Sequence, residues 1–207
     1  NIIPPVQMWM GNYAAQIQSL KQQNVLRPHR EWLAVLQPQK DFDNDIEAVA
    51  PLLTSQWGQG VNYNYYCPKD EDGTNGRCVT GCVATAMAQL IYYFRFPDTG
   101  MASYSYTHDT YGTLSANFGQ TKYDYDAMTD KPDQINLPMS LLIHHCGVAV
   151  DMVYGPNASG MYNHKAAYAL RTYFKYSPQT AYVFRDTTLM DWDSLIVTHL
   201  NKNIPLY

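Results

Sequence analysis

Apolar residues recur at helical spacing in several segments, separated by polar and turn-rich stretches. Near the N-terminus, apolar residues three or four positions apart predict a helix over residues 6–23. This stripe consists of Met10, Ala14, Ile17 and Leu20. The acidic residues 41–47 have little to bury, so we expect an exposed linker there. A second helical unit is expected from Pro51 to Trp57, ahead of a loop rich in Tyr and Asn.

The strongest helix prediction falls on residues 82–94. Alanines raise its helix propensity, and Pro97 prevents it from continuing. Its apolar stripe consists of Val83, Met87, Leu90, Ile91 and Phe94. Downstream, residues 98–137 predict turns and short extended pieces. Further helices are expected at 138–146, 163–174 and 192–200, with a strand at 147–153.

Composition narrows the class of protein. The chain has 207 residues, 46% of them hydrophobic, which suffices for one good core. Its net charge is -4 and its 14 Lys and Arg are scattered, so no basic stripe points to nucleic acid. No apolar run approaches the roughly 20 residues of a membrane span. Only 15% of residues are charged and 18 are Tyr, which favours an extracellular protein.

The sequence Thr80-Gly81-Cys82 carries the best chemical signal. A cysteine in the first turn of a helix feels the positive end of the helix dipole and unpaired backbone N–H groups, which favour thiolate. The same N–H groups can hold a developing oxyanion. Gly81 allows close approach of a substrate, and Thr80 is a candidate N-cap. The alternative is that Cys82 is a small buried residue.

The other cysteines suggest structural roles. Cys67 and Cys78 flank a polar loop and would be able to form a disulfide in an exported protein. Cys146 lies in an apolar stretch and is expected in the core. The spacing of Cys78 and Cys82 suits zinc, but Cys67 and Cys146 do not form a second pair, so no metal site is expected.

The six histidines lack a distinctive setting. We expect His29 and His108 in loops, His144 and His145 in a helix with one packed and one solvated, and His199 near a helix end. The sixth is His164. For each of them, a structural role is favoured over a catalytic one.

Several segments together resemble the streptopain-like cysteine proteases, from about residue 48 to residue 207. The most specific is Gly-Cys-Val-Ala-Thr-Ala at residues 81–86. The others are residues 51–60, Tyr63-Asn64, Cys67-Pro68, Tyr92-Tyr93, Phe96-Pro97, residues 146–156 and residues 203–207.

This resemblance implies a papain-like α+β fold, secretion as a zymogen and endopeptidase activity with Cys82 as nucleophile. It divides the chain into the end of a prodomain with its linker, residues 1–47, and the N-terminal part of the catalytic domain, residues 48–207. The loop at 154–160 resembles the stretch that lines the substrate cleft, although it also fits an ordinary Gly-Pro turn. The expected substrate-binding residues are therefore Gly81, Gly155 and Ser159.

The resemblance also implies that the catalytic His lies beyond Tyr207, so the papain-like domain is expected to be incomplete and this chain alone inactive. No cofactor is implied. The expected partners are protein or peptide substrates. The part that carries the His is expected either as a second chain after cleavage or to have been lost. The alternatives are an inactive secreted relative that binds peptides or a protease, and acyl transfer by the same Cys–His pair.

Overall fold

The computed structural model describes residues 4–23 and 49–207. Helix α1 (Pro4–Gln22) confirms the helix predicted at 6–23. From Val6 onward it belongs to a different unit from residues 51–207, and the two units are described separately. The apolar side chains of α1 are about half exposed. The predicted linker at 41–47 lies outside the described residues, as does His29.

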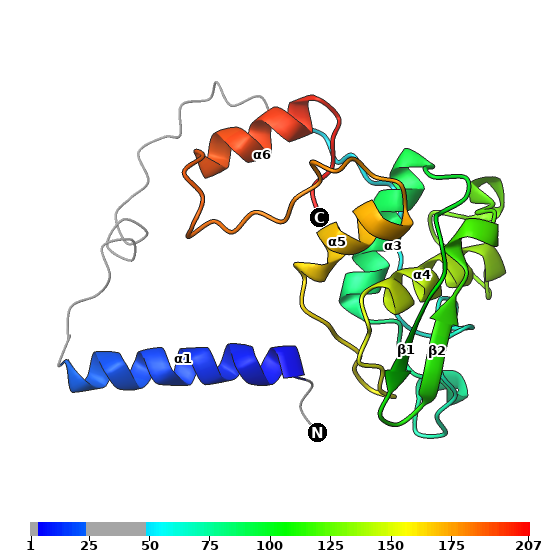
Figure 1. Ribbon diagram of the computed structural model, residues 1–207, viewed down its shortest axis with the longest axis horizontal. Coiled ribbons are helices and arrows are strands. Elements are labelled where there is room, and N and C mark those ends of the chain that lie inside the picture. The colour runs from blue at the N-terminus through cyan, green and yellow to red at the C-terminus, as the bar shows by residue number, and fades with distance from the viewer. Residues whose placement is uncertain (1–3, 24–48) are drawn as a thin grey trace. The chain divides into compact units, whose positions relative to one another are not determined.

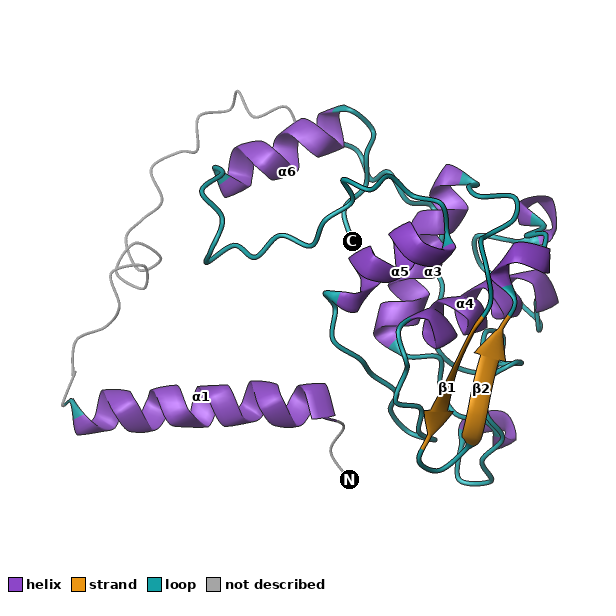
Figure 2. Cartoon of the chain, in the orientation of Figure 1, coloured by secondary structure: helices purple, strands orange, loops and turns teal. Residues whose placement is uncertain are grey.

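Two helices, α3 (Cys82–Phe94) and α4 (Leu137–Ala149), pack against each other and organise the unit of residues 51–207 (Figures 1 and 2). The bounds predicted for the first of them are confirmed. Helix α3 ends where Arg95 turns left-handed, at φ 49°, and its amide binds the carbonyls of Ile91 and Tyr92. Met87 and Ile91 are completely buried. Burial of a side chain of that size contributes about 1.5–3 kcal/mol.

Helix α4 is longer than predicted, because residues 147–149 continue the helix instead of forming a strand. Every residue from His145 to Val150 is buried, so the segment has no solvent-facing side that would mark its period. Periodicity cannot distinguish a buried strand from a buried helix in such a run. The start of α4 is well defined, since the Asn136 side chain accepts a hydrogen bond from the Met139 amide at 3.0 Å.

A small antiparallel hairpin contacts α4. Strands β1 (Tyr104–His108) and β2 (Gly112–Ala116) pair with Tyr104 opposite Ala116 and His108 opposite Gly112. Short 3-10 turns at Thr74–Gly76, Phe118–Gln120 and Tyr125–Ala127 complete this region. The prediction of turns and short extended pieces over 98–137 is therefore confirmed.

Two further helices follow. Helix α5 (Lys165–Tyr173) packs on α4, and its Tyr173 ring stacks on Phe118 with centroids 4.6 Å apart. Helix α6 (Trp192–Asn201) is followed by Asn203, whose carbonyl accepts a hydrogen bond from the Tyr93 hydroxyl at 3.0 Å. Both helices were predicted, although α5 is shorter than expected. In the described parts of the chain, no helix is both long and apolar enough to cross a membrane.

The helical unit predicted from Pro51 is wrong, since residues 51–57 form no helix. The Gln56 amide binds the Asp130 carbonyl at 2.7 Å, and the Trp57 indole N–H binds the Thr129 carbonyl at 2.9 Å. Trp57 is buried, so these long-range partners override the local preference for helix.

Candidate active site

The turn before α3 presents Cys82 at the surface. Gly81 is the N-cap, with φ 86° and ψ 141°, a conformation that glycine adopts most easily. Cys82 is the first residue of the helix and its side chain is exposed. The predicted N-cap role of Thr80 is wrong. Thr80 is buried, and its Oγ1 lies 2.8 Å from Oγ1 of Thr85.

Gly81 is closely surrounded by a second segment. A β-carbon at this position would lie 2.7 Å from Sδ of Met152 and 3.2 Å from the Ser159 carbonyl oxygen. No side chain fits there without displacing its neighbours. The φ of the residue before the candidate nucleophile therefore favours glycine, and any side chain there would also require Met152 to shift.

The loop at 154–160 is hydrogen-bonded to the residues that lead into Cys82. The Val79 amide donates to the Gly155 carbonyl at 3.2 Å. The Ser159 hydroxyl donates to the Val79 carbonyl at 2.7 Å and accepts from the Gly155 amide at 3.0 Å. The structure thus brings Gly81, Gly155 and Ser159 together beside Cys82. The Ser159 hydroxyl is buried and paired inward, so it is not available as a hydrogen-bonding group at the surface.

Asp151 anchors the segment that precedes this loop. Its carboxylate accepts a hydrogen bond from the Tyr104 hydroxyl at 2.6 Å and pairs with the Lys165 ammonium at 2.7 Å. The hydrogen bond to Asp151 raises the pKa of the Tyr104 phenol to about 12. Met152 follows directly and is fully buried, so the wall beside Gly81 is held from β1, α4 and α5.

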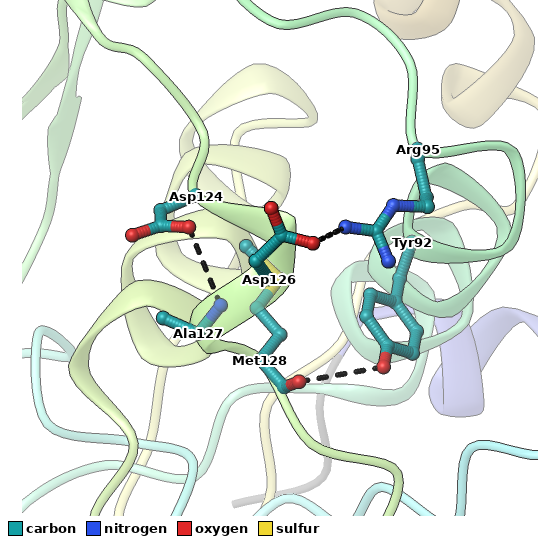
Figure 3. A network of polar contacts seen from close by, with 6 residues as sticks. All are labelled: Tyr92, Arg95, Asp124, Asp126, Ala127 and Met128. Carbon is teal, nitrogen blue, oxygen red and sulfur yellow. Dashed lines mark hydrogen bonds and ion pairs between the residues drawn. The ribbon is translucent and has the colours of Figure 1, made fainter.

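The far end of α3 is fixed by polar contacts to the turn at Tyr125–Ala127 (Figure 3). Arg95 pairs with Asp126, and the Tyr92 hydroxyl donates to the Met128 carbonyl at 3.4 Å. Asp124 accepts from the Ala127 amide at 3.3 Å, which closes the turn. Helix α3 is thereby attached at both ends, with Cys82 at its accessible end.

The three other cysteines are buried free thiols. Burial raises the pKa of Cys67 to about 12, and it raises the pKa of Cys78 and of Cys146 as well. Cys146 lies in the core as predicted. The disulfide suggested between Cys67 and Cys78 is not present in the structure. Within residues 4–23 and 49–207, no cluster of three or more His, Cys, Asp or Glu is arranged to hold a metal ion.

Two histidine predictions need correction. His145 is buried, and His144 is partly buried with its Nδ1 cut off from solvent rather than solvated; burial lowers the pKa of His144 to about 4 and that of His145 to about 3. His145 Nδ1 lies 2.9 Å from the Tyr123 hydroxyl. His108 ends β1 and is buried, so it is not a loop residue.

The remaining described histidines have other settings. His199 Nδ1 lies 2.8 Å from the Leu195 carbonyl in α6, and His164 precedes α5. Among the described residues, no histidine is hydrogen-bonded to Cys82.

Three neighbours of the candidate nucleophile were not singled out from the sequence: Met152, Thr85 and Tyr207. Burial raises the pKa of the Tyr207 phenol, and the charge of a Cys82 thiolate raises it further. Tyr207 therefore lies within electrostatic range of Cys82. Only the three-dimensional contact with Gly81 identifies Met152, whereas Thr85 lies within the Gly-Cys-Val-Ala-Thr-Ala segment itself.

Sequence comparison relates the chain to known cysteine proteases. The sequence model of the Peptidase C10 family matches residues 57–207. Streptopain from Streptococcus pyogenes is 30% identical over 188 residues, which cover 77% of this chain and 46% of streptopain. The thiol protease/hemagglutinin PrtT from Porphyromonas gingivalis is 28% identical, with 82% of this chain and 21% of that protein covered. The chain spans about half the length, or less, of these curated relatives.

Comparison with solved structures also relates the chain to cysteine proteases. Active wild-type interpain A cysteine protease from Prevotella intermedia is 37% identical with a TM-score of 0.61, covering 74% of this chain and 66% of that one. A fragment of prointerpain A from the same organism is 42% identical with a TM-score of 0.55. The match covers 61% of this chain and 43% of that fragment. The expected papain-like α+β fold is confirmed, and this chain contains part of it. With a family match over most of its length, the chain belongs to the Peptidase C10 family.

Proposed function

We propose that this chain is the nucleophile-bearing part of a secreted bacterial cysteine endopeptidase. The observation that carries the proposal is the position of Cys82. Of the four cysteines it alone is exposed, and it is the first residue of a helix whose other end and inner face are fixed. A helix N-terminus favours the anionic form of a nucleophile and of a substrate oxyanion.

In the proposed reaction, the Cys82 thiolate attacks the carbonyl carbon of a peptide bond. The carbonyl oxygen becomes an oxyanion, which the Cys82 amide stabilises. Collapse of this intermediate breaks the C–N bond, and an imidazolium donates its proton to the leaving amine. A thioester remains on Cys82. The imidazole then takes a proton from water, and the resulting attack releases the acid and the free thiol.

We place the imidazole on a histidine beyond Tyr207. The family resemblance supports this, and so does the finding that the described histidines make no hydrogen bond to Cys82. The segment that carries this histidine would be either a continuation of the chain or a second chain. The substrates would be proteins or peptides, with Gly81, Gly155 and the main chain of Ser159 lining the cleft.

The N-terminal part suits a prodomain. We propose that residues 1–47 are the end of that prodomain and its linker, and that residues 48–207 begin the catalytic domain. The assignment of α1 to a unit separate from residues 51–207 supports this division. Synthesis as an exported zymogen follows from the same proposal.

The test uses a longer protein that includes the segment proposed to carry the base. It should hydrolyse denatured casein, and Cys82→Ala should abolish the activity while Cys146→Ala retains it. Mass spectrometry of a rapidly quenched reaction should detect an acyl group on the peptide that contains Cys82. Hydrolysis that survives Cys82→Ala would exclude this mechanism.

One observation favours a second candidate, an inactive relative that binds peptides or a protease. This is the lack of a hydrogen bond between Cys82 and any described histidine. The longer protein distinguishes the two, because the second candidate would bind peptide without releasing products and without an acyl group on Cys82.

A further inference from the structure

The turn that carries Cys82 rests on a buried pair of hydroxyl groups. Thr85 Oγ1 lies 3.0 Å from the Gly81 carbonyl oxygen and 2.8 Å from Thr80 Oγ1. Thr80 is fully buried and Thr85 is 5% exposed. Among the described residues, the Thr85 hydroxyl has no acceptor other than Thr80 and the Gly81 carbonyl. Its proton therefore points to that carbonyl, and the Thr80 proton points to Thr85.

This carbonyl belongs to the peptide bond between Gly81 and Cys82. A trans peptide is planar, so its C=O and N–H point in opposite directions. Holding the Gly81 carbonyl inward therefore holds the Cys82 N–H outward, toward the side from which a substrate approaches. The Thr85 amide also donates to this carbonyl, at 3.1 Å, as the first bond of the helix.

A second hydrogen bond matters here because glycine restrains this peptide so little. Gly81 has no β-carbon, and its φ of 86° lies where other residues are strained. Rotation of the Gly81–Cys82 peptide plane therefore meets a low intrinsic barrier. Many helical Thr residues bond the carbonyl four residues back. At this position that carbonyl shares its peptide plane with the N–H of the nucleophile.

We propose that Thr85 is a positioning residue, which orients the Cys82 amide as the donor to the oxyanion, with Thr80 supporting Thr85. This rests on the proposed function. Thr85 itself touches no reacting atom. Its side chain acts through the Gly81 carbonyl, so its loss should affect the step in which negative charge develops and should leave the exposed thiol accessible.

The variants that test this are matched. Thr85→Val keeps the shape and removes the hydroxyl, whereas Thr85→Ser keeps the hydroxyl. Thr80→Val removes only the hydroxyl that donates to Thr85 and keeps the bond from Thr85 to the Gly81 carbonyl. Thr121→Val is the control, because the Thr121 hydroxyl makes the same kind of bond, to the Asn117 carbonyl at 2.8 Å, on an exposed turn.

The first measurement uses the 207-residue chain and the residual dipolar coupling of the Cys82 N–H, which reports the direction of that bond. Thr85→Val should change this coupling beyond experimental error, while couplings from Met87 to Phe94 stay constant. Thr85→Ser and Thr121→Val should preserve it. An unchanged coupling in a folded Thr85→Val chain would overturn the proposal.

The second measurement uses the longer protein. Removing an oxyanion donor costs about 10²–10³ in kcat, so misorienting one should lower kcat by roughly tenfold in Thr85→Val. KM and the rate of Cys82 alkylation by iodoacetamide should stay within about twofold, and Thr85→Ser should restore kcat. If the rate of Cys82 alkylation fell as much as kcat, the turn would have lost its structure, and the proposal would be contradicted.

The two measurements separate this proposal from the proposed function. If the wild-type longer protein shows no Cys82-dependent hydrolysis, the function fails, and the coupling alone still decides whether Thr85 orients the amide. If Thr85→Val does not fold, Thr80→Val must lower kcat by about two- to threefold, and unchanged kcat there would overturn the proposal.

Discussion

A β-carbon on Gly81 would lie 2.7 Å from the sulfur of Met152, closer than such atoms approach each other in folded proteins. Met152 is fully buried, so its thioether would have to shift within the packed core to make room. The backbone of Gly81 is also left-handed, at φ 86°. The position of Cys82 thus depends on a contact between residues that are 71 apart in the sequence.

We therefore expect Gly81→Ala to destabilise the chain by about 2–4 kcal/mol, from overpacking and backbone strain together. Urea unfolding followed by tryptophan fluorescence measures this. The matched control is Gly60→Ala, since a β-carbon there would meet no atom within 4 Å. Gly60→Ala should remain within about 1 kcal/mol of wild type. Equal stability of the two variants would show that Met152 does not confine Gly81.

The second prediction concerns thiol reactivity. At pH 7.5 the raised pKa values of Cys67, Cys78 and Cys146 keep these buried thiols protonated, whereas Cys82 is exposed. Brief iodoacetamide treatment should therefore label Cys82 at least about tenfold faster than any other cysteine. Peptide mass mapping measures the rates.

The controls for this labelling are Cys82→Ser, which should remain almost unlabelled, and the denatured chain, which should label at all four positions. Earlier labelling of Cys146 would contradict the assignment of Cys82 as the accessible thiol.

The elements that the sequence predicted correctly are those whose pattern is local. Helix α3 has an apolar stripe and alanines within its own residues, and Pro97 follows closely. Trp57 misled the prediction because its partner is the Thr129 carbonyl, 72 residues away. The run after His145 misled it because burial on all sides removes the periodicity that separates helix from strand.

In the candidate site, too, residues in a local pattern could be predicted from the sequence, and residues placed by long-range packing could not. Cys82 and Gly81 stand out because a helix N-terminus and a glycine are visible in a short segment. Met152 lies beside them only through the packing of α4 and the loop that follows it, so no local pattern marks it. The inward hydroxyl of Ser159 likewise depends on the Val79 carbonyl, 80 residues earlier.

The third prediction concerns acid stability. In the folded chain, burial lowers the pKa of His144 to about 4 and that of His145 to about 3, below the ordinary value of 6.5. The unfolded chain therefore binds more protons below pH 6.5, and the free energy of unfolding should fall as the pH drops from 6.5 toward 4. Thermal melts across this range measure the effect.

A variant isolates the contribution of His145. His145→Gln should lower stability at pH 7 by about 1–2 kcal/mol, through loss of packing and of the Tyr123 hydrogen bond. It should also make the decline between pH 6.5 and 4 less steep. An unaltered slope in His145→Gln would exclude this histidine as the source.

The fourth prediction tests the proposed boundary between prodomain and catalytic domain. Residues 41–47 are acidic and contain little to bury, which is typical of segments cut first by proteases. Subtilisin at low concentration should first yield a fragment that begins close to residue 48 and contains α3. N-terminal sequencing identifies the cut. Cleavage within residues 82–95 before any cut near 41–47 would place the boundary elsewhere.

The last prediction concerns the activity of the 207-residue chain by itself. A cysteine peptidase needs an imidazole both to activate the thiol and to activate water, and removing one member of such a pair costs orders of magnitude. His108 and His145 are committed to other partners, and His199 is bound within α6. We therefore expect turnover of a fluorogenic peptide at least about 10³-fold below that of the longer protein.

The accessible thiol should nonetheless react with iodoacetamide in both proteins, so loss of turnover with retained labelling would locate the defect in the missing base. Adding the separate segment that carries the proposed histidine should restore hydrolysis, and Cys82→Ala should remove it again. Robust Cys82-dependent hydrolysis by the 207-residue chain would mean that a histidine within it is the base. In that case, Gln variants of His144, His145, His164 and His199 would identify the base. Only substitution of the base should abolish turnover while leaving the fold intact.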